Sequence, residues 1–216
     1  MKKTIVAPSI LSANFAYMGQ AVQELQVSGA DWVHVDVMDG VFVPNISFGQ
    51  KMVKDVRAVT TLPLDVHLMI VNPERYIQEF ADRGADYITI HIESTDNVAS
   101  ALKKIKQCGK KVGLSVKPAT PISDITPFID LIDLILIMSV EPGFGGQKFM
   151  PIALEKIAQA KQLVGDRNII IEVDGGVGEQ NIDQIVNAGA DAVVAGSSVF
   201  SAPDKATAIK RLSGDK

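Results

Sequence analysis

Cysteine is nearly absent from this sequence, and so are long hydrophobic runs and clusters of basic residues. The lone Cys108 cannot form an intramolecular disulfide, which predicts a reducing, cytoplasmic location. No apolar stretch approaches the roughly 20 residues that cross a bilayer, so we expect no membrane partner. Basic residues never exceed two in succession and the net charge is −4, so we expect no nucleic-acid partner.

Short β-branched segments alternate with segments of helical periodicity along the chain. Alternation of this kind predicts right-handed crossovers and a parallel sheet. A Gly-Ala-Asp junction precedes three of the expected strands, at residues 29–31, 84–86 and 189–191, and indicates a faint repeat of the unit. We expect strands at 4–8, 32–38, 64–68, 87–92, 111–116, 134–140, 169–173 and 192–195. We expect helices at 18–27, 49–59, 73–83, 97–107, 151–163, 178–187 and 204–212, with a weaker one near 122–128.

Eight strand–helix units in 216 residues predict a (β/α)8 TIM barrel, in a single domain spanning residues 1–216. A doubly wound open sheet is the alternative. The sequence has no Gly-x-Gly-x-x-Gly motif after the first expected strand, which favours the closed barrel. In such barrels the reactive groups lie at the C-terminal ends of the strands.

Polar side chains stand at these strand ends. His34 and Asp36 alternate with valines on the second expected strand, so both point to the face opposite the valines. His67 alternates with apolar residues on the third strand, and Asp174 ends the seventh. Two histidines and two aspartates at one rim match a site for a divalent transition metal, with Zn²⁺ or Fe²⁺ fitting the donor set. Two carboxylates in one mouth also match paired acid–base chemistry.

Glycine-bearing turns follow the last three expected strands, at residues 142–147, 174–176 and 196–198. Glycine lets backbone N–H groups approach an anion, and the loops after strands seven and eight commonly bind phosphate in this fold. Met38, Met69 and Met138 lie near strand ends, where they either fill gaps in the core or form an apolar ring around the reaction centre. His91 ends the fourth strand, and we do not assign it to the site.

Five segments carry a resemblance to a known family. They are residues 7–13 (APSILSA), 34–40 (HVDVMDG), 64–69 (LDVHLM), 137–147 (IMSVEPGFGGQ) and 172–176 (EVDGG). In this order and spacing they resemble the ribulose-phosphate 3-epimerases, over essentially the whole chain. The resemblance implies a metal-dependent (β/α)8 barrel of the ribulose-phosphate-binding type. It also implies an enzyme of the pentose phosphate pathway, which interconverts D-ribulose 5-phosphate and D-xylulose 5-phosphate.

The resemblance also implies roles for particular residues. Asp36 and Asp174 resemble the acid–base pair, and with His34 and His67 they resemble the ligands of one divalent metal per chain, Zn²⁺ foremost, with Fe²⁺, Mn²⁺ or Co²⁺ as alternatives. The family assembles as dimers or hexamers, so we expect a homo-oligomer that acts on a small sugar phosphate. Met38, Met69 and Met138 resemble the apolar ring of the family. The residues that resemble substrate contacts are Ser9, His67, Gly143, Phe144, Gly145, Gly146, Asp174, Gly175, Gly176, Gly196 and Ser197.

Other functions stay open on the sequence alone. A 3-epimerase of D-allulose 6-phosphate would use the same metal ligands and aspartates. A decarboxylase or aldolase of the phosphate-binding barrels is disfavoured by His34 and His67. A non-catalytic barrel that only binds a sugar phosphate predicts loss of a ligand or an acid, yet all of these residues are present.

Overall fold

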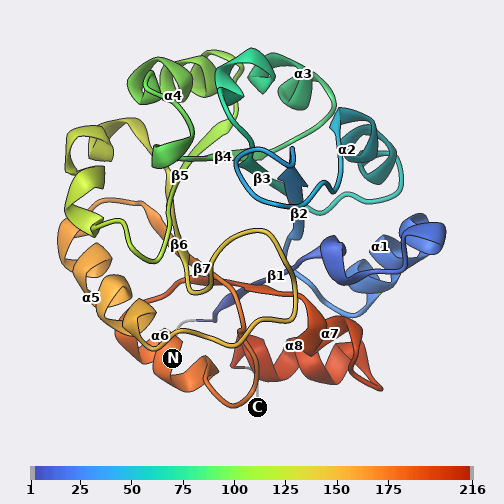
Figure 1. Cartoon of the computed structure of the whole chain (residues 1–216). Coiled ribbons are helices and arrows are strands. Elements are labelled where there is room, and N and C mark those ends of the chain that lie inside the picture. The colour runs from blue at the N-terminus through green and yellow to red at the C-terminus, as the bar shows by residue number, and fades with distance from the viewer. Residues whose placement is uncertain (1–2, 215–216) are drawn as a thin grey trace.

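The computed structural model describes residues 3–214 of the chain. Within this range eight parallel strands roll into one barrel, and helices surround it (Figure 1). The strands neighbour one another in the order β1-β8-β7-β6-β5-β4-β3-β2, so each strand from β2 to β8 lies beside its predecessor or successor in the chain. They are β1 (Ile5–Pro8), β2 (Val33–Met38), β3 (Leu64–Met69), β4 (Tyr87–His91), β5 (Lys111–Val116), β6 (Leu134–Met138), β7 (Ile170–Asp174) and β8 (Ala192–Ala195).

The barrel closes between β1 and β2. The hydrogen-bonded ladder is reduced there to one parallel bridge between Ser9 and His34, whereas β1 pairs with β8 along its whole length. Strands in sequential order around a ring are the topology of a (β/α)8 barrel and not of a doubly wound sheet. The predicted fold class is therefore confirmed.

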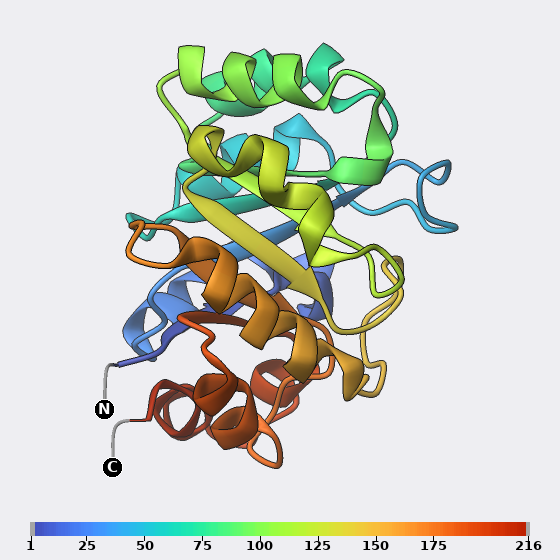
Figure 2. The same cartoon turned by 90° about the vertical axis from the view of Figure 1, so that its left-hand side faces the viewer.

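Helices cover the outside of the barrel on all sides (Figures 1 and 2). The α-helices are α1 (Met18–Val27), α2 (Gln50–Arg57), α3 (Ile77–Asp82), α4 (Val98–Gln107), α5 (Ile152–Val164), α6 (Ile182–Ala188), α7 (Ser197–Phe200) and α8 (Lys205–Ser213). Short 3₁₀ helices complete the connections: η1 (Ile10–Ser12), η2 (Phe15–Tyr17), η3 (Pro73–Arg75), η4 (Ile92–Ser94) and η5 (Ile122–Leu131).

Several elements differ from their sequence prediction. The weak helix after β5 is the 3₁₀ helix η5, which contains Pro127, a residue that has no N–H for an α-helical hydrogen bond. The helix predicted at 73–83 is divided into η3 and α3. The helix predicted at 178–187 begins later, because Asn181 accepts the N–H of Gly178 and stabilises a turn before α6. The turn predicted after β8 runs into the short helix α7.

Aspartates at the N-terminal ends of the even-numbered strands join neighbouring strands. Each accepts, through its carboxylate, the N–H of a residue at or near the start of the preceding odd-numbered strand. Three of the four belong to the Gly-Ala-Asp junctions, which gives that sequence repeat a structural reason. The contacts are Val6 N to Asp31 (3.0 Å), Leu64 N to Asp86 (2.8 Å), Val112 N to Asp133 (2.9 Å) and Ile171 N to Asp191 (3.2 Å).

Apolar side chains fill two spaces. The larger core lies between the sheet and the helices and contains the valines of β2, each at most 4% exposed. The other lies inside the barrel, where the Trp32 and Tyr87 rings pack with their centroids 4.6 Å apart, near Leu134. These interior residues come from the N-terminal ends of the strands. Asp36, His67 and Asp174 lie farther along their strands, toward the C-terminal end.

The connection after β5 is held by a lysine from an outer helix. Lys156 of α5 is only 5% exposed, and its ammonium group donates hydrogen bonds to three backbone carbonyls of this loop. The acceptors are the carbonyls of Lys117 (2.6 Å), Pro118 (3.1 Å) and Thr120 (2.8 Å). The loop between β5 and η5 is thus fixed against α5.

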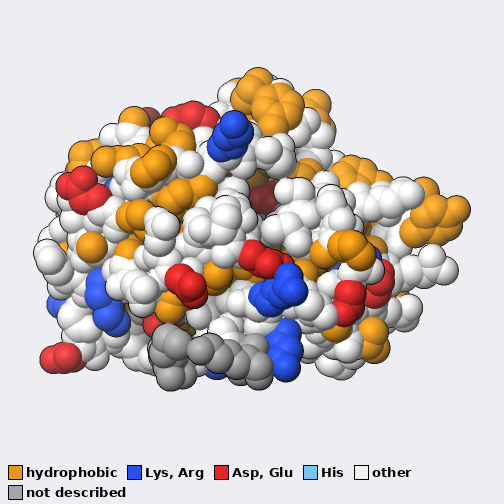
Figure 3. All heavy atoms as spheres, turned by 90° about the horizontal axis from the view of Figure 1, so that it is seen from below, with side chains coloured by type: hydrophobic (Ala, Val, Ile, Leu, Met, Phe, Trp, Pro, Cys, Tyr) orange, Lys and Arg blue, Asp and Glu red, His pale blue; other side chains and the backbone are white. Residues whose placement is uncertain are grey.

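The surface seen from below in Figure 3 carries acidic and basic side chains intermingled with apolar ones, and neither charge forms a continuous patch on this face. No helix among residues 3–214 combines the length and the apolar character needed to cross a bilayer.

Candidate metal and acid–base site

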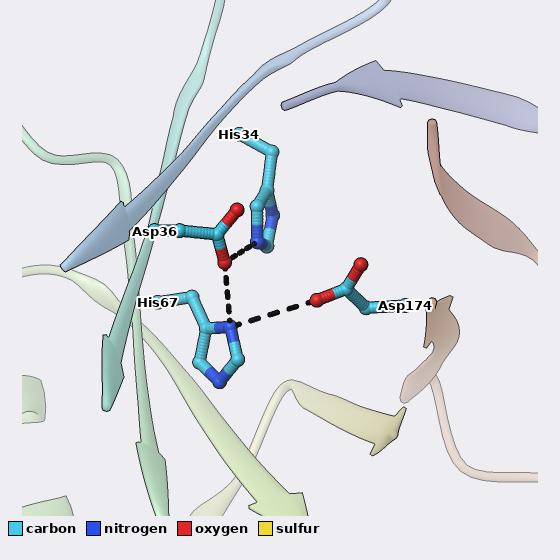
Figure 4. A group of neighbouring side chains, drawn as sticks. All are labelled: His34, Asp36, His67 and Asp174. Atoms are coloured by element: carbon cyan, nitrogen blue, oxygen red, sulfur yellow. Dashed lines mark hydrogen bonds and ion pairs between the residues drawn. The ribbon is translucent and has the colours of Figure 1, made fainter. Parts of the chain in front are cut away.

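Three strands bring the four predicted ligands together at the C-terminal end of the barrel. His34 and Asp36 lie on β2, and Asp36 is in register with His67 on β3. Asp174 ends β7 and faces them across the barrel (Figure 4). Because alternate residues of a strand share one face, the valines of β2 pack outward while His34 and Asp36 point inward.

The ligand atoms of these four residues all lie within 4.8 Å of one another. Asp36 Oδ1 lies 3.2 Å from His34 Nε2 and 3.2 Å from His67 Nδ1, and Asp174 Oδ2 lies 3.9 Å from His67 Nδ1. Two imidazole nitrogens and two carboxylates match the donors that Zn²⁺ and similar transition metals prefer. The residues present therefore fit a divalent metal.

The electrostatics of the cluster fit a cation as well. Burial and the neighbouring charge of Asp36 raise the pKa of Asp174 to about 7. Burial alone would raise the pKa of Asp36, but contacts with His34 and His67 lower it well below its usual range. Two carboxylates this close repel each other when both are ionised, and a divalent cation between them would offset that repulsion.

One pocket opens over this cluster. Every predicted substrate contact except His67 lines it, and so do all three methionines of the predicted ring. His34 and His67 are fully buried and do not reach the pocket surface. The predicted site residues that line the pocket are Ser9, Asp36, Met38, Met69, Met138, Gly143, Phe144, Gly145, Gly146, Asp174, Gly175, Gly176, Gly196 and Ser197.

The glycine loops shape one side of the pocket. Gly176 has a φ of +64°, and a Cβ at this position would lie 2.3 Å from the backbone nitrogen of Phe149. The close approach of two backbones therefore requires glycine here. Met38 and Met69 share a small apolar cluster, and Met138 belongs to the barrel interior. The methionines thus serve as core residues and also face the pocket.

Sequence reasoning missed several residues that contact the cluster from behind. Asp65 Oδ2 lies 2.5 Å from His34 Nδ1, on the ring edge away from the metal-ligand atoms. Glu172 is fully buried beside Asp65, and burial followed by the charge of Asp65 raises the pKa of Glu172 above its usual range. Asp65 precedes His67 by two residues and Glu172 precedes Asp174 by two. The same period-two alternation could therefore have found both.

His91, unassigned from the sequence, contacts the site through His67. The Nε2 atoms of the two rings are 2.8 Å apart, and His91 Nδ1 lies 3.1 Å from Glu93 Oε2. Burial lowers the pKa of His91 to about 4, so this ring is neutral at neutral pH. Its neighbour Glu93 has a pKa of about 2, because hydrogen bonds from His91 and Thr120 outweigh the effect of burial.

Solved structures with low sequence identity share the fold of this chain. A mutant tryptophan synthase alpha-subunit from Pyrococcus furiosus aligns with a TM-score of 0.74 at 16% identity, over 99% of this chain and 100% of that chain. A Mycobacterium tuberculosis tryptophan synthase aligns with a TM-score of 0.73 at 16% identity, over 99% and 92%. At this identity the likeness shows the barrel fold alone.

Sequence comparisons are more specific. The model of the ribulose-phosphate 3-epimerase family matches residues 5–200. The ribulose-phosphate 3-epimerase of Synechocystis sp. is 48% identical over 100% of this chain and 95% of its own length, and that of Bacillus subtilis is 46% identical over 98% and 99%. The chloroplastic ribulose-5-phosphate-3-epimerase of Arabidopsis thaliana is 49% identical over 98% and 77%. The chain therefore belongs to the ribulose-phosphate 3-epimerase family.

Proposed function

We propose that this protein inverts C3 of D-ribulose 5-phosphate to give D-xylulose 5-phosphate, reversibly, through an enediolate. The observation that carries the proposal is the placement of Asp36 and Asp174. They project from β2 and β7 toward one pocket, with two histidines beside them. Inversion at a carbon next to a ketone requires a base on one face of the planar intermediate and an acid on the other.

Asp36 accepts the C3 proton in the ribulose-to-xylulose direction, and Asp174 donates a proton to the opposite face. Their roles exchange in the reverse direction. Ser9 donates a hydrogen bond to Asp36 Oδ2 and so orients this carboxylate toward the pocket. The methionines at the pocket floor carry no exchangeable proton, so they exclude water without supplying a competing acid.

His34 Nε2, Asp36, His67 Nδ1 and Asp174 hold one divalent metal, with Zn²⁺ first and Fe²⁺, Mn²⁺ or Co²⁺ as alternatives. When bound, such an ion stabilises negative charge that develops on oxygen next to the reacting carbon. The two histidines contribute no charge of their own when neutral, so the two carboxylates balance the ion.

The glycine loops hold the phosphate of the substrate. Residues 143–146, 175–176 and 196–197 line the pocket, and their backbone N–H groups are the candidate phosphate donors. Glycine permits a phosphate to approach such groups closely. Holding the far end of the sugar phosphate places C3 between the two aspartates, and positioning of this kind is a large part of enzymatic rate enhancement. We also propose that the protein is one domain, acts in the cytoplasm and forms a homo-oligomer.

An assay on purified protein tests the proposal. Protein prepared without chelator should contain close to one divalent ion per chain and convert D-ribulose 5-phosphate to D-xylulose 5-phosphate. Removal of the ion should abolish turnover, and addition of Zn²⁺, Fe²⁺, Mn²⁺ or Co²⁺ should restore it. Full activity of metal-free protein would overturn the ligand assignment. A kcat/KM higher on D-allulose 6-phosphate than on the pentulose would overturn the substrate assignment.

A further inference from the structure

We propose that His91 and Glu93 are positioning residues, which determine the ring nitrogen of His67 that carries hydrogen. They keep that hydrogen on Nε2, so that Nδ1 of His67 is free to bind a cation. The inference deepens the proposed function and rests on it for the presence of a metal. Affinity for a divalent ion can be measured without turnover, so the inference is tested apart from catalysis.

The structure shows a continuous line of polar contacts from a loop to the site. Glu93 Oε2 lies 3.1 Å from His91 Nδ1, and His91 Nε2 lies 2.8 Å from His67 Nε2. The other nitrogen of His67, Nδ1, lies 3.2 Å from Asp36 Oδ1 and 3.9 Å from Asp174 Oδ2. Both imidazole rings are fully buried, so water does not compete for these contacts.

With a cation on Nδ1 of His67, the hydrogens along this line have a single order. An ionised carboxylate only accepts hydrogen bonds, so His91 carries its hydrogen on Nδ1, facing Glu93. The neutral ring then has a lone pair on Nε2. Two ring nitrogens 2.8 Å apart share one hydrogen, so His67 donates from its own Nε2. His67 Nδ1 keeps the lone pair that would bind a cation between Asp36 and Asp174; without a cation, the Asp36 carboxylate 3.2 Å away would itself require a hydrogen on Nδ1.

Glu93 is held in this role by the loop after β5. Its Oε1 atom accepts the backbone N–H of Lys117 at 2.8 Å and the hydroxyl of Thr120. The N–H of Lys117 can only donate. A glutamine at position 93 must therefore turn its amide oxygen toward Lys117 and its NH₂ group toward His91. The NH₂ group donates, so His91 would move its hydrogen to Nε2, and His67 would move its hydrogen to Nδ1.

The same reasoning explains why His34 presents Nε2 to the metal site, whereas His67 presents Nδ1. His34 Nδ1 lies 2.5 Å from Asp65, and His34 Nε2 faces Asp36. A carboxylate behind His34 acts directly, whereas the carboxylate behind His67 acts through a second imidazole. Metal-binding histidines commonly donate their second N–H to such a partner, and loss of the partner typically reduces metal affinity about 10- to 100-fold.

Two substitutions separate this role from a merely structural one. Glu93→Gln reverses the order of hydrogens along the line. His91→Gln preserves it, because the amide NH₂ can donate to Glu93 while the amide oxygen accepts from His67. Thr120→Val is a matched control, since it removes a hydrogen bond to Glu93 and leaves the carboxylate in place.

The chain has only three histidines, so the ¹⁵N spectrum of its imidazoles is simple to assign. In Zn²⁺-loaded protein near neutral pH we expect hydrogen on Nε2 of His67 and on Nδ1 of His91 in the wild type and in Thr120→Val. In Glu93→Gln we expect the His91 hydrogen on Nε2. Affinity for Zn²⁺, measured by competition with a chelating dye, should fall about 10- to 100-fold in Glu93→Gln and far less in His91→Gln and Thr120→Val.

An unchanged His91 tautomer and an unchanged Zn²⁺ affinity in Glu93→Gln would overturn the inference. So would a loss of affinity in His91→Gln as large as that in Glu93→Gln, which would point to packing alone. If Glu93→Gln fails to fold, the comparison of His91→Gln with His91→Leu decides, because leucine cannot accept from His67. A wild-type chain that binds no divalent ion would overturn the proposed metal site, and this inference with it.

Discussion

The hydroxyl of Ser9 donates a hydrogen bond to the carboxylate of Asp36, with 2.5 Å between Ser9 Oγ and Asp36 Oδ2. The contact crosses the seam where the barrel closes, next to the single bridge between Ser9 and His34. It occupies Oδ2 of Asp36 and leaves Oδ1 facing the two histidines. Ser9, directly after the first strand, thereby orients the carboxylate that we assign as proton acceptor.

Replacement of Ser9 by alanine should lower kcat and leave the metal in place. A hydrogen bond to a charged group contributes about 1.5–3 kcal/mol, which corresponds to a loss of about 10- to 100-fold in rate. Ser9→Thr keeps a hydroxyl and should retain most of the activity. Steady-state kinetics and metal analysis of both variants check this. Wild-type kcat in Ser9→Ala would show that Asp36 needs no such partner.

Isotope exchange should distinguish the two aspartates. In D₂O, Asp174→Asn should exchange the C3 hydrogen of D-ribulose 5-phosphate through Asp36 without forming D-xylulose 5-phosphate. Asp36→Asn should do the reverse, exchanging only D-xylulose 5-phosphate. Net epimerisation should fall about 100- to 10,000-fold in each variant.

NMR of the recovered sugar phosphates reads out the exchange at C3. Asparagine keeps an oxygen that can bind a cation, so metal content is the control for each variant. Exchange of both substrates by the same variant would contradict the assignment of one face to each aspartate.

Gly176→Ala should distort the loop on the phosphate side of the pocket. The added Cβ would meet the backbone of Phe149 at 2.3 Å, and the φ of +64° disfavours any side chain. We expect a loss of about 2–4 kcal/mol in the free energy of unfolding and a raised KM. Gly145→Ala is the control, because its Cβ would meet only Ser12 Oγ at 3.8 Å. Urea unfolding should place this control within about 0.5 kcal/mol of the wild type.

The stability that Asp204 contributes at the start of α8 should depend on pH. Asp204 accepts hydrogen bonds from Ala206 N and from the hydroxyl of Thr207, and the latter foremost lowers the pKa of Asp204 below its usual value. A lowered pKa in the folded state stabilises the fold above the unfolded-state pKa of about 4, and this contribution is lost as the pH falls below it.

Asp204→Asn keeps a side chain that can cap the helix but cannot titrate. Its urea midpoint should lie below that of the wild type at pH 7 and approach it at pH 3. A difference that does not change between these pH values would show that ionised Asp204 contributes nothing to stability.

Much of the site could be predicted because strands impose a period of two. Alternation with valines placed His34 and Asp36 on the interior face of β2, and the rule that barrels react at strand C-termini placed His67 and Asp174 nearby. The structure brings these four together. Their roles in metal binding and proton transfer stay predictions, which the experiments above address.

The residues that were missed act through the orientation of their side chains, which a sequence pattern does not encode. His91 alternates with isoleucines in the same way as a core residue would, and only the approach of its Nε2 atom to His67 separates the two cases. The partner of Glu93 lies 24 residues away at Lys117, in a loop with no periodicity. The 3₁₀ helix η5 and the short helix α7 likewise depend on local turn geometry, which period analysis does not capture.

The hydrogen bonds of Lys156 connect a helix of the outer layer to the metal-ligand cluster at the centre of the barrel. Lys156 of α5 holds the loop that contains Lys117 and Thr120, and this loop in turn holds Glu93, which contacts His91. The line continues to His67 at the metal-ligand cluster. A change on α5 that displaces this ammonium group would thus reach the reaction centre without touching the substrate. Searches for variants with altered metal preference should therefore include α5, a helix outside the barrel.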